Sequence, residues 1–140
     1  MYHTSPQEIT TGTINSYGVA GSCLFFSDNI YAMTQSDELY VYEADFNCLE
    51  AFELYDVEII AEIEEKFNCS TEEAEGLLDA SLSEWDYSSD ADYSWWLQGK
   101  RGECAKKMGY DGCEDKDEQG TVYIIPMLGR ESELKRVDNV

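Results

Sequence analysis

Basic residues are scarce in this chain of 140 residues, which has 9 Lys and Arg against 30 Asp and Glu and a net charge of −21. The shortage is concentrated in residues 1–99, where 21 acids accompany one base, Lys66, whereas residues 100–140 contain 9 acids and 8 bases. An acidic surface repels nucleic acid phosphates and attracts positively charged proteins. Direct nucleic acid binding is therefore not expected. A basic protein partner is one explanation of the charge, and solubility alone is the other.

Long apolar runs and clusters of metal ligands are also absent. The longest apolar runs, CLFF and VYIIPML, are too short to cross a bilayer, and no basic N-terminal region precedes an apolar stretch. The 5 cysteines form no CxxC pair, and a single histidine cannot complete a zinc site. These absences exclude a membrane protein and predict a cytoplasmic protein with no metal and with buried, free thiols.

The chain has enough apolar material to fold. Hydrophobic residues make up 43% and aromatic residues 13% of the sequence, with 10 Tyr and 3 Trp. No internal repeat, linker or low-complexity segment divides it. We therefore expect a single domain over residues 1–140.

Strand patterns occur near both ends of the chain. Residues 2–4, SCLFFS at 22–27 and ELYVYEAD at 38–45 are expected to be strands, and alternation in the third indicates that both of its faces are covered. Residues 113–126 resemble a hairpin around KDEQG, and ELKRV is a possible last strand.

Helical patterns occupy the middle. We expect helices over residues 48–68, 70–82 and 93–108, the second opened by a capping box formed by Ser70 and Glu73. Gly99 and Gly102 argue against the third helix, and SEWDYSSDADY is expected to be a surface loop. Strands at both ends with helices between them predict an α+β fold.

Considered individually, the residues that could take part in catalysis or binding each have an ordinary structural explanation. An isolated histidine such as His3 is usually a surface or packing residue. Aromatic residues around Ser27 are typical of a strand that packs into a core, and acids in a turn serve solubility and turn geometry. Their order along the chain is more informative than any one of them.

That order is a histidine beside a hydroxyl on the first strand, an aromatic strand ending in Phe-Ser, and an acidic loop before a late strand. The stretches HTSPQEITT, LFFSDNIYAMT, SWWLQG and DEQGTVYIIPMLGR carry it. In these stretches the sequence resembles phage-encoded anti-CRISPR ADP-ribosyltransferases that inactivate type I-F CRISPR surveillance complexes. The acidic middle, about residues 37–92, contributes little to the resemblance.

The resemblance implies NAD as co-substrate and assigns residues to it. His3 matches a first-strand histidine that hydrogen-bonds the ribose hydroxyls, and Thr4 would help to position the same dinucleotide. Phe26 and Ser27 match the second-strand position that lines the nicotinamide pocket, and Tyr31 is placed like the aromatic residue that covers the nicotinamide ring. Aromatic faces would exclude water and hold the leaving group in place.

The same resemblance assigns the catalytic acid to Asp117, with Glu118 as second choice and Gln119 as a candidate for orienting the acceptor. Breaking the nicotinamide–ribose bond develops positive charge on the sugar, which a fixed carboxylate can stabilise. The chain departs from many ADP-ribosyltransferases in having Val122 where they carry a glutamate in the late strand. The acid in the preceding turn would have to act in its place.

The fold implied is a split, strongly twisted β core with helices packed around it and NAD in the cleft between the sheet halves. The function implied is mono-ADP-ribosylation, in the host bacterial cytoplasm, of the large PAM-reading subunit of a type I-F complex, which would block binding of target DNA. The alternative is a non-enzymatic DNA mimic whose 19 acids between Asp37 and Asp92 fill a basic groove. An ADP-ribosyltransferase-like domain with an unrelated role also remains open.

Overall fold

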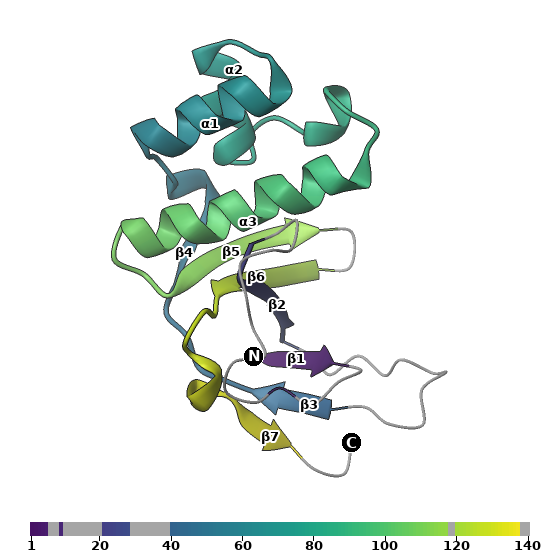
Figure 1. Cartoon of the computed structure of the whole chain (residues 1–140), viewed down its shortest axis with the longest axis vertical. Coiled ribbons are helices and arrows are strands. Elements are labelled where there is room, and N and C mark those ends of the chain that lie inside the picture. The colour runs from purple at the N-terminus through teal and green to yellow at the C-terminus, as the bar shows by residue number, and fades with distance from the viewer. Residues whose placement is uncertain (6–8, 10–20, 29–39, 118–119, 138–140) are drawn as a thin grey trace.

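Seven strands form one mixed sheet in the order β4-β5-β6-β2-β1-β3-β7 (Figure 1). The structure, a computed structural model, describes residues 1–5, 9, 21–28, 40–117 and 120–137. The strands are β1 (Tyr2–Ser5), β2 (Cys23–Ser27), β3 (Tyr40–Glu43), β4 (Cys48–Glu50), β5 (Gly112–Asp117), β6 (Gly120–Pro126) and β7 (Lys135–Val137). The expected α+β fold is confirmed, with a sheet that joins both ends of the chain.

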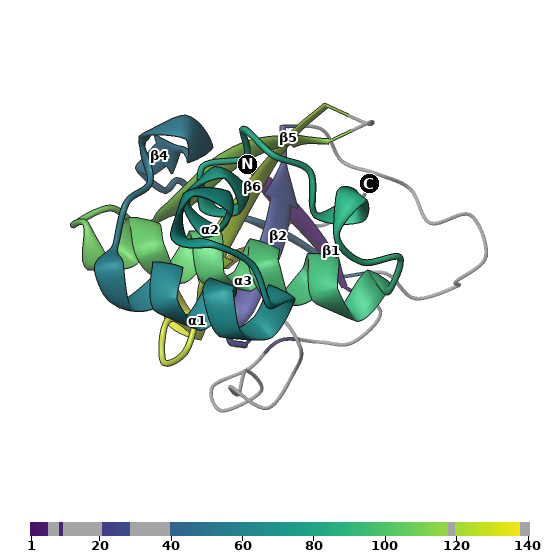
Figure 2. The ribbon, with the colours of Figure 1, turned by 90° about the horizontal axis from the view of Figure 1, so that it is seen from above.

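Three α-helices occupy the middle of the chain, as predicted. They are α1 (Val57–Phe67), α2 (Thr71–Leu78) and α3 (Ala91–Lys107), with short 3-10 helices η1 (Ala51–Glu53), η2 (Glu84–Asp86) and η3 (Glu131–Glu133). Helix α3 lies across β5 and β6, and α1 and α2 lie on its outer side (Figures 1 and 2). No helix in the described part of the chain is long and apolar enough to cross a membrane.

The central seam of the sheet is between β1 and β2. These two strands share one antiparallel pair, Tyr2 with Ser27, whereas β1 pairs with β3 along all four of its residues. β2 in turn pairs with β6 along all five of its residues. β1 and β2 are therefore each paired along their whole length with their outer neighbours, β3 and β6, but with each other at one position.

The helix predicted over residues 48–68 is wrong for the residues before Val57. Cys48–Glu50 is strand β4, which pairs in parallel with the start of β5, and α1 begins only after Asp56. The Asp56 side chain accepts a hydrogen bond from the backbone N–H of Ile59 and so caps the helix. The pairing partner of β4 lies more than 60 residues further along the chain. The spacing of apolar residues within residues 48–68 cannot indicate such a distant contact.

The other two helices agree with their sequence signals. The capping box of Ser70 and Glu73 opens α2 as predicted. Helix α3 continues through Gly99 and Gly102 because the sheet needs a close approach there: a Cβ on Gly102 would lie 2.9 Å from Cγ2 of Ile124 in β6. Gly102, which lowers the helix propensity, thus allows α3 to pack tightly against the sheet.

Each face of the sheet has its own apolar cluster. On the helix face, residues of α1, α2 and α3 pack against Cys113 and Ile124, and on the opposite face Phe26 packs with Phe46 and Ile125. Val41 and Tyr42, neighbours in β3, are both only 4% exposed, which confirms the prediction that both faces of this strand are covered.

Candidate active site

His3 lies in the seam between β1 and β2. Its Nδ1 atom is 2.8 Å from the carbonyl oxygen of Phe25, and its ring centroid is 5.5 Å from that of Phe26. Because a carbonyl oxygen can only accept, Nδ1 must carry the proton in this contact. Burial lowers the pKa of His3 below its ordinary value, an effect that the Phe25 hydrogen bond partly offsets, so the neutral ring is favoured. Neutral His3 therefore presents Nε2 as an acceptor.

The predicted partners of His3 fall on both faces of the sheet. Phe26 is 1% exposed and contacts both His3 and Phe46, so these three rings lie on the face away from the helices. Ser27 pairs with Val122, which in turn pairs with Asp115. Cross-strand partners share a face, and Asp115 faces α3, so Ser27 lies on the helix face. The structure thus joins His3 to Phe26 directly and places Ser27 at the one paired position of the seam.

The remaining predicted residues are only partly described. Thr4 pairs with Val41 of β3, and Asp117 ends β5 opposite Gly120. Tyr31, Glu118 and Gln119 lie outside the described residues. The expected hairpin is present, with arms β5 and β6, and it brings the backbone of Asp117 to the end of β5.

Two side chains near His3 were missed by the sequence analysis. The hydroxyl of Tyr123 donates to Asp28 Oδ1 at 2.8 Å, and Tyr123 pairs with Phe26 across β2 and β6. Burial and the Asp28 carboxylate raise the pKa of Tyr123 above its ordinary value. The signal available in the sequence was the position of Asp28 directly after the Phe-Ser end of a strand, although nothing there indicated its tyrosine partner.

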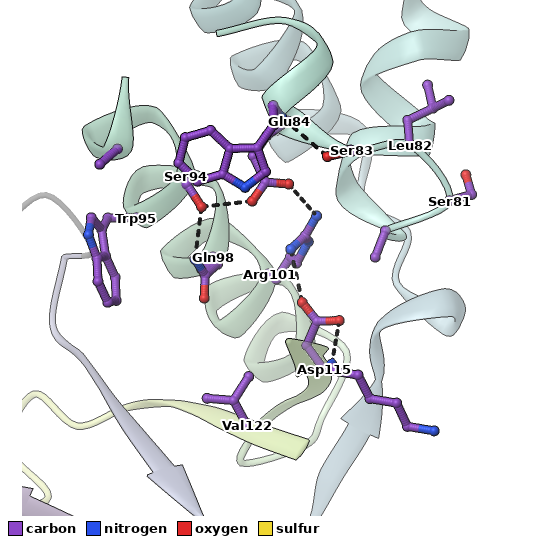
Figure 3. Close-up of a pocket in the computed structure, with 14 residues that line it drawn as sticks. Ser81, Leu82, Ser83, Glu84, Ser94, Trp95, Gln98, Arg101, Asp115 and Val122 are labelled. Atoms are coloured by element: carbon purple, nitrogen blue, oxygen red, sulfur yellow. Dashed lines mark hydrogen bonds and ion pairs between the residues drawn. The ribbon is translucent and has the colours of Figure 1, made fainter. Parts of the chain in front are cut away.

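A second group of polar residues lines a pocket of about 1140 Å³ between η2, α3 and the β5–β6 hairpin (Figure 3). Arg101, 3% exposed, lies at its floor and donates from Nη1 to Asp115 Oδ2 at 3.0 Å. A guanidinium nitrogen also lies 3.9 Å from Glu84, whose other oxygen accepts from the Ser94 hydroxyl at 2.7 Å. The sequence offered no signal for this network because its members are spread over three elements.

Arg101 also binds the end of α2. It donates from Nη2 to the Leu77 carbonyl at 2.8 Å and from Nε to the Leu78 carbonyl at 3.3 Å. These carbonyls belong to the last turn of the helix, which lacks partners within the helix itself. One buried guanidinium therefore satisfies the helix end and holds Asp115 of the hairpin.

The cysteines are poorly suited to nucleophilic chemistry. Cys23, Cys104 and Cys113 are buried, in agreement with the prediction of buried free thiols, while Cys48 and Cys69 are half-buried. Burial raises the pKa of Cys23 and Cys48 to about 12 and that of Cys104 to about 11. Since the thiolate is the reactive form, these thiols are unreactive near neutral pH.

Comparison with known proteins gives two similarities. A family model described as anti-CRISPR type I-F ADP-ribosyltransferase AcrIF11 matches residues 1–129. A solved structure described as the crystal structure of an anti-CRISPR protein is similar in fold, with a TM-score of 0.60 and 22% sequence identity over 98% of this chain and 93% of that chain. No curated protein matches the sequence.

Proposed function

Since the chain belongs to the anti-CRISPR type I-F ADP-ribosyltransferase AcrIF11 family, we propose that residues 1–140 form one ADP-ribosyltransferase-like domain that modifies a protein with ADP-ribose taken from NAD. Nicotinamide leaves with the electron pair of its bond to the ribose. A nucleophilic atom of the acceptor then bonds to the same sugar carbon and loses a proton. The family's activity implies the use of NAD.

The observation that best supports this assignment is the geometry of His3. An imidazole with its Nδ1 proton directed at the Phe25 carbonyl keeps Nε2 as an acceptor, and a ribose hydroxyl is a donor of the right kind for it. The seam of the sheet lies beside it, since β1 leaves β2 after one pair. We place the sugar of the dinucleotide here, with Thr4 positioning it, Phe26 packed against the His3 ring and Ser27 beside the nicotinamide.

The acid in this proposal is Asp117, with Glu118 as second choice, and Tyr31 covers the nicotinamide. A hairpin is a suitable carrier for the acid because its ladder fixes the strand that precedes the turn: β5 and β6 pair along five positions up to Asp117 and Gly120. The carboxylate would stabilise the positive charge that develops on the sugar as the bond to nicotinamide lengthens. Val122, which replaces the more usual glutamate, has no charge to supply.

The proposed target is the large PAM-reading subunit of a type I-F CRISPR surveillance complex in the host bacterial cytoplasm. A surface that reads DNA is rich in Lys and Arg, and a chain of net charge −21 is attracted to it. ADP-ribose adds two negative charges and considerable bulk there. Target DNA would then be repelled from the modified subunit.

The test is to incubate the purified complex with NAD and a tenfold smaller amount of this protein, and to weigh each subunit by mass spectrometry. Transfer predicts that one subunit gains the mass of ADP-ribose in more copies than there are inhibitor molecules. Asp117→Ala should remove the modification.

The charge also supports a second candidate, the DNA mimic, because the acids alone could fill a basic groove. A mimic needs one molecule per complex, ignores NAD and tolerates Asp117→Ala. Inhibition that is stoichiometric and independent of NAD would overturn the transferase assignment.

A further inference from the structure

The pocket over Arg101 has apolar walls that face solvent. Leu82, Trp85 and Trp95 line it and are 37%, 54% and 46% exposed, respectively. We call this hollow the tryptophan pocket. Its floor is closed by the hydrogen-bonded side chains of Ser94 and Arg101, which are buried and already paired. Exposed indole rings above a rigid polar floor are typical of surfaces that bind another molecule.

Exposed acids that neighbour the lining residues Trp85 and Ala91 in the sequence form what we call the rim of the tryptophan pocket, and the lining itself includes one exposed base, Lys116. Residues 67–99 contain 8 acids and no Lys or Arg. Three of these acids, Asp86, Asp90 and Asp92, are exposed in η2 and at the start of α3. Among the described residues, which include every Lys and Arg of the chain, no base forms an ion pair with these three.

Acids near Lys100 and Lys107 of α3, in contrast, form ion pairs. Lys107 lies 2.9 Å from Asp56 and 3.2 Å from Glu58, and Lys100 lies 3.3 Å from Glu103. The rim acids therefore differ from the acids beside Lys100 and Lys107, whose charge is neutralised within the chain.

We propose, on the basis of the function proposed above, that the tryptophan pocket docks a basic segment of the protein that receives ADP-ribose. A Lys or Arg side chain of that segment would lie over the indole of Trp85 or Trp95, and the carboxylates of the rim would face its charge. Burying the exposed apolar area supplies affinity, and the unpaired acids select a basic segment over a neutral one.

The charge of the rim also decides against two other occupants. DNA and the pyrophosphate of NAD are both anionic, and the rim acids repel them. Arg101, the one buried cation of the pocket, is held by Asp115 and two carbonyls and lies beneath the apolar walls. Against the one exposed base in the described lining, Lys116, stand the three rim acids, so the charge around the pocket favours a basic protein over a phosphate.

The position of the pocket fits this role. Val122 lines the pocket and is the direct cross-strand partner of Ser27, which we place beside the nicotinamide. A segment docked in the tryptophan pocket would thus lie one strand from the proposed nicotinamide position at Ser27. It would bring the acceptor to the donor without entering the seam at His3.

The experiment compares two double variants. The first, Trp85→Ser with Asp86→Lys, changes an exposed indole and an exposed acid of η2. The control, Phe52→Ser with Glu53→Lys, changes an exposed aromatic residue and an exposed acid of η1, outside the pocket. Both alter the net charge by the same amount, so a difference between them reports on the pocket and not on overall charge.

Two quantities are measured for each variant: the Kd for the purified type I-F surveillance complex in the absence of NAD, and the steady-state KM for the complex and for NAD. The η2 variant should raise the Kd and the KM for the complex about tenfold or more. Its KM for NAD should stay within about twofold of the unchanged protein, as should all three constants of the η1 control. Asp86→Lys alone, which keeps both indoles, should raise the KM for the complex about threefold.

Three results would overturn the docking proposal: no change in affinity for the complex, equal losses in both double variants, or a rise in the KM for NAD as large as that for the complex. Because the Kd is measured without NAD, it is independent of the transfer reaction. A protein that binds the complex through this pocket but modifies nothing would refute the proposed function and leave the docking site intact.

Discussion

At the scale of single residues, the position of His3 so close to the N-terminus is explained by the contacts of β1. The terminal ammonium group of Met1 donates to the Ala44 carbonyl at 3.1 Å, and the Ala44 amide donates to the Met1 carbonyl at 3.0 Å. Strand β1 then pairs with β3 along its whole length. A terminus held in this way does not fray, so it can present an imidazole in a fixed direction.

His3→Asn separates the two functions of this ring. The shorter amide can still donate to the Phe25 carbonyl in place of Nδ1, but it lacks an atom in the position of Nε2. Losing one hydrogen bond to a ribose hydroxyl costs about 1.4 kcal/mol, so we expect the KM for NAD to rise about tenfold. The melting temperature, measured by circular dichroism, should change little. An unchanged KM for NAD would contradict the role given to Nε2.

The same imidazole should make NAD binding depend on pH. The folded-state pKa of His3 is lowered from 6.5, so more than half of the rings are neutral at pH 6.5 and the ring takes up its proton at a lower pH than a free imidazole. Protonation converts Nε2 from acceptor to donor. The KM for NAD should therefore change little at pH values well above 6.5 and rise as the pH falls below 6.5.

Protonation of His3 also favours the unfolded chain, which takes up the proton first, so stability should fall as the pH drops below 6.5. His3→Asn is the control, and its KM for NAD should not follow this part of the profile. A KM profile that is identical in both proteins would assign the pH dependence to another group.

At the scale of elements, the almost fully buried side chain of Arg101 joins α2, α3 and β5. Arg101→Leu would leave the carbonyls of Leu77 and Leu78 and the Asp115 carboxylate without this donor. Breaking a buried ion pair in this way costs about 3–5 kcal/mol, which urea denaturation would measure.

Lys100→Leu, at the adjacent position, is the control. Its ion pairs are more exposed, so its loss should cost about 1 kcal/mol or less. Equal losses in the two variants would contradict the role assigned to Arg101.

The elements themselves were largely predictable where local signals define them. The capping box at Ser70, the CLFFS strand and the hairpin before Pro126 follow from neighbouring residues, and all are present. Strand β4 was missed because its partner is β5, far along the chain. The Arg101 network was missed for the same reason. His3 gave only a weak signal by itself, and its contacts with Phe25 and Phe26 depend on the approach of β1 to β2, which no local pattern indicates. Its contact with a ribose is implied by the resemblance to a family and stays a prediction.

At the scale of the whole molecule, the acidic and basic residues are unevenly distributed along the chain. Most bases lie in residues 100–140, and several of them neutralise acids near the ends of α1 and α3. The acids of residues 67–99 have no bases among them in the sequence. One region of the chain is therefore strongly negative, and three of its acids, Asp86, Asp90 and Asp92, neighbour lining residues of the tryptophan pocket in the sequence. Recognition of a basic target and steering toward it would use the same residues.

Salt should consequently act in opposite directions on the two substrates. Attraction between the acidic chain and a basic complex is screened as the Debye length shortens from about 10 Å at 0.1 M salt. We expect the KM for the complex to rise about tenfold between about 50 and 300 mM salt. NAD carries a negative pyrophosphate and is repelled by a chain of net charge −21, so its KM should stay constant or fall over the same range. Steady-state kinetics with each substrate varied in turn would measure both trends. A KM for the complex that ignores salt would mean that the acidic surface serves solubility and has no part in recognition.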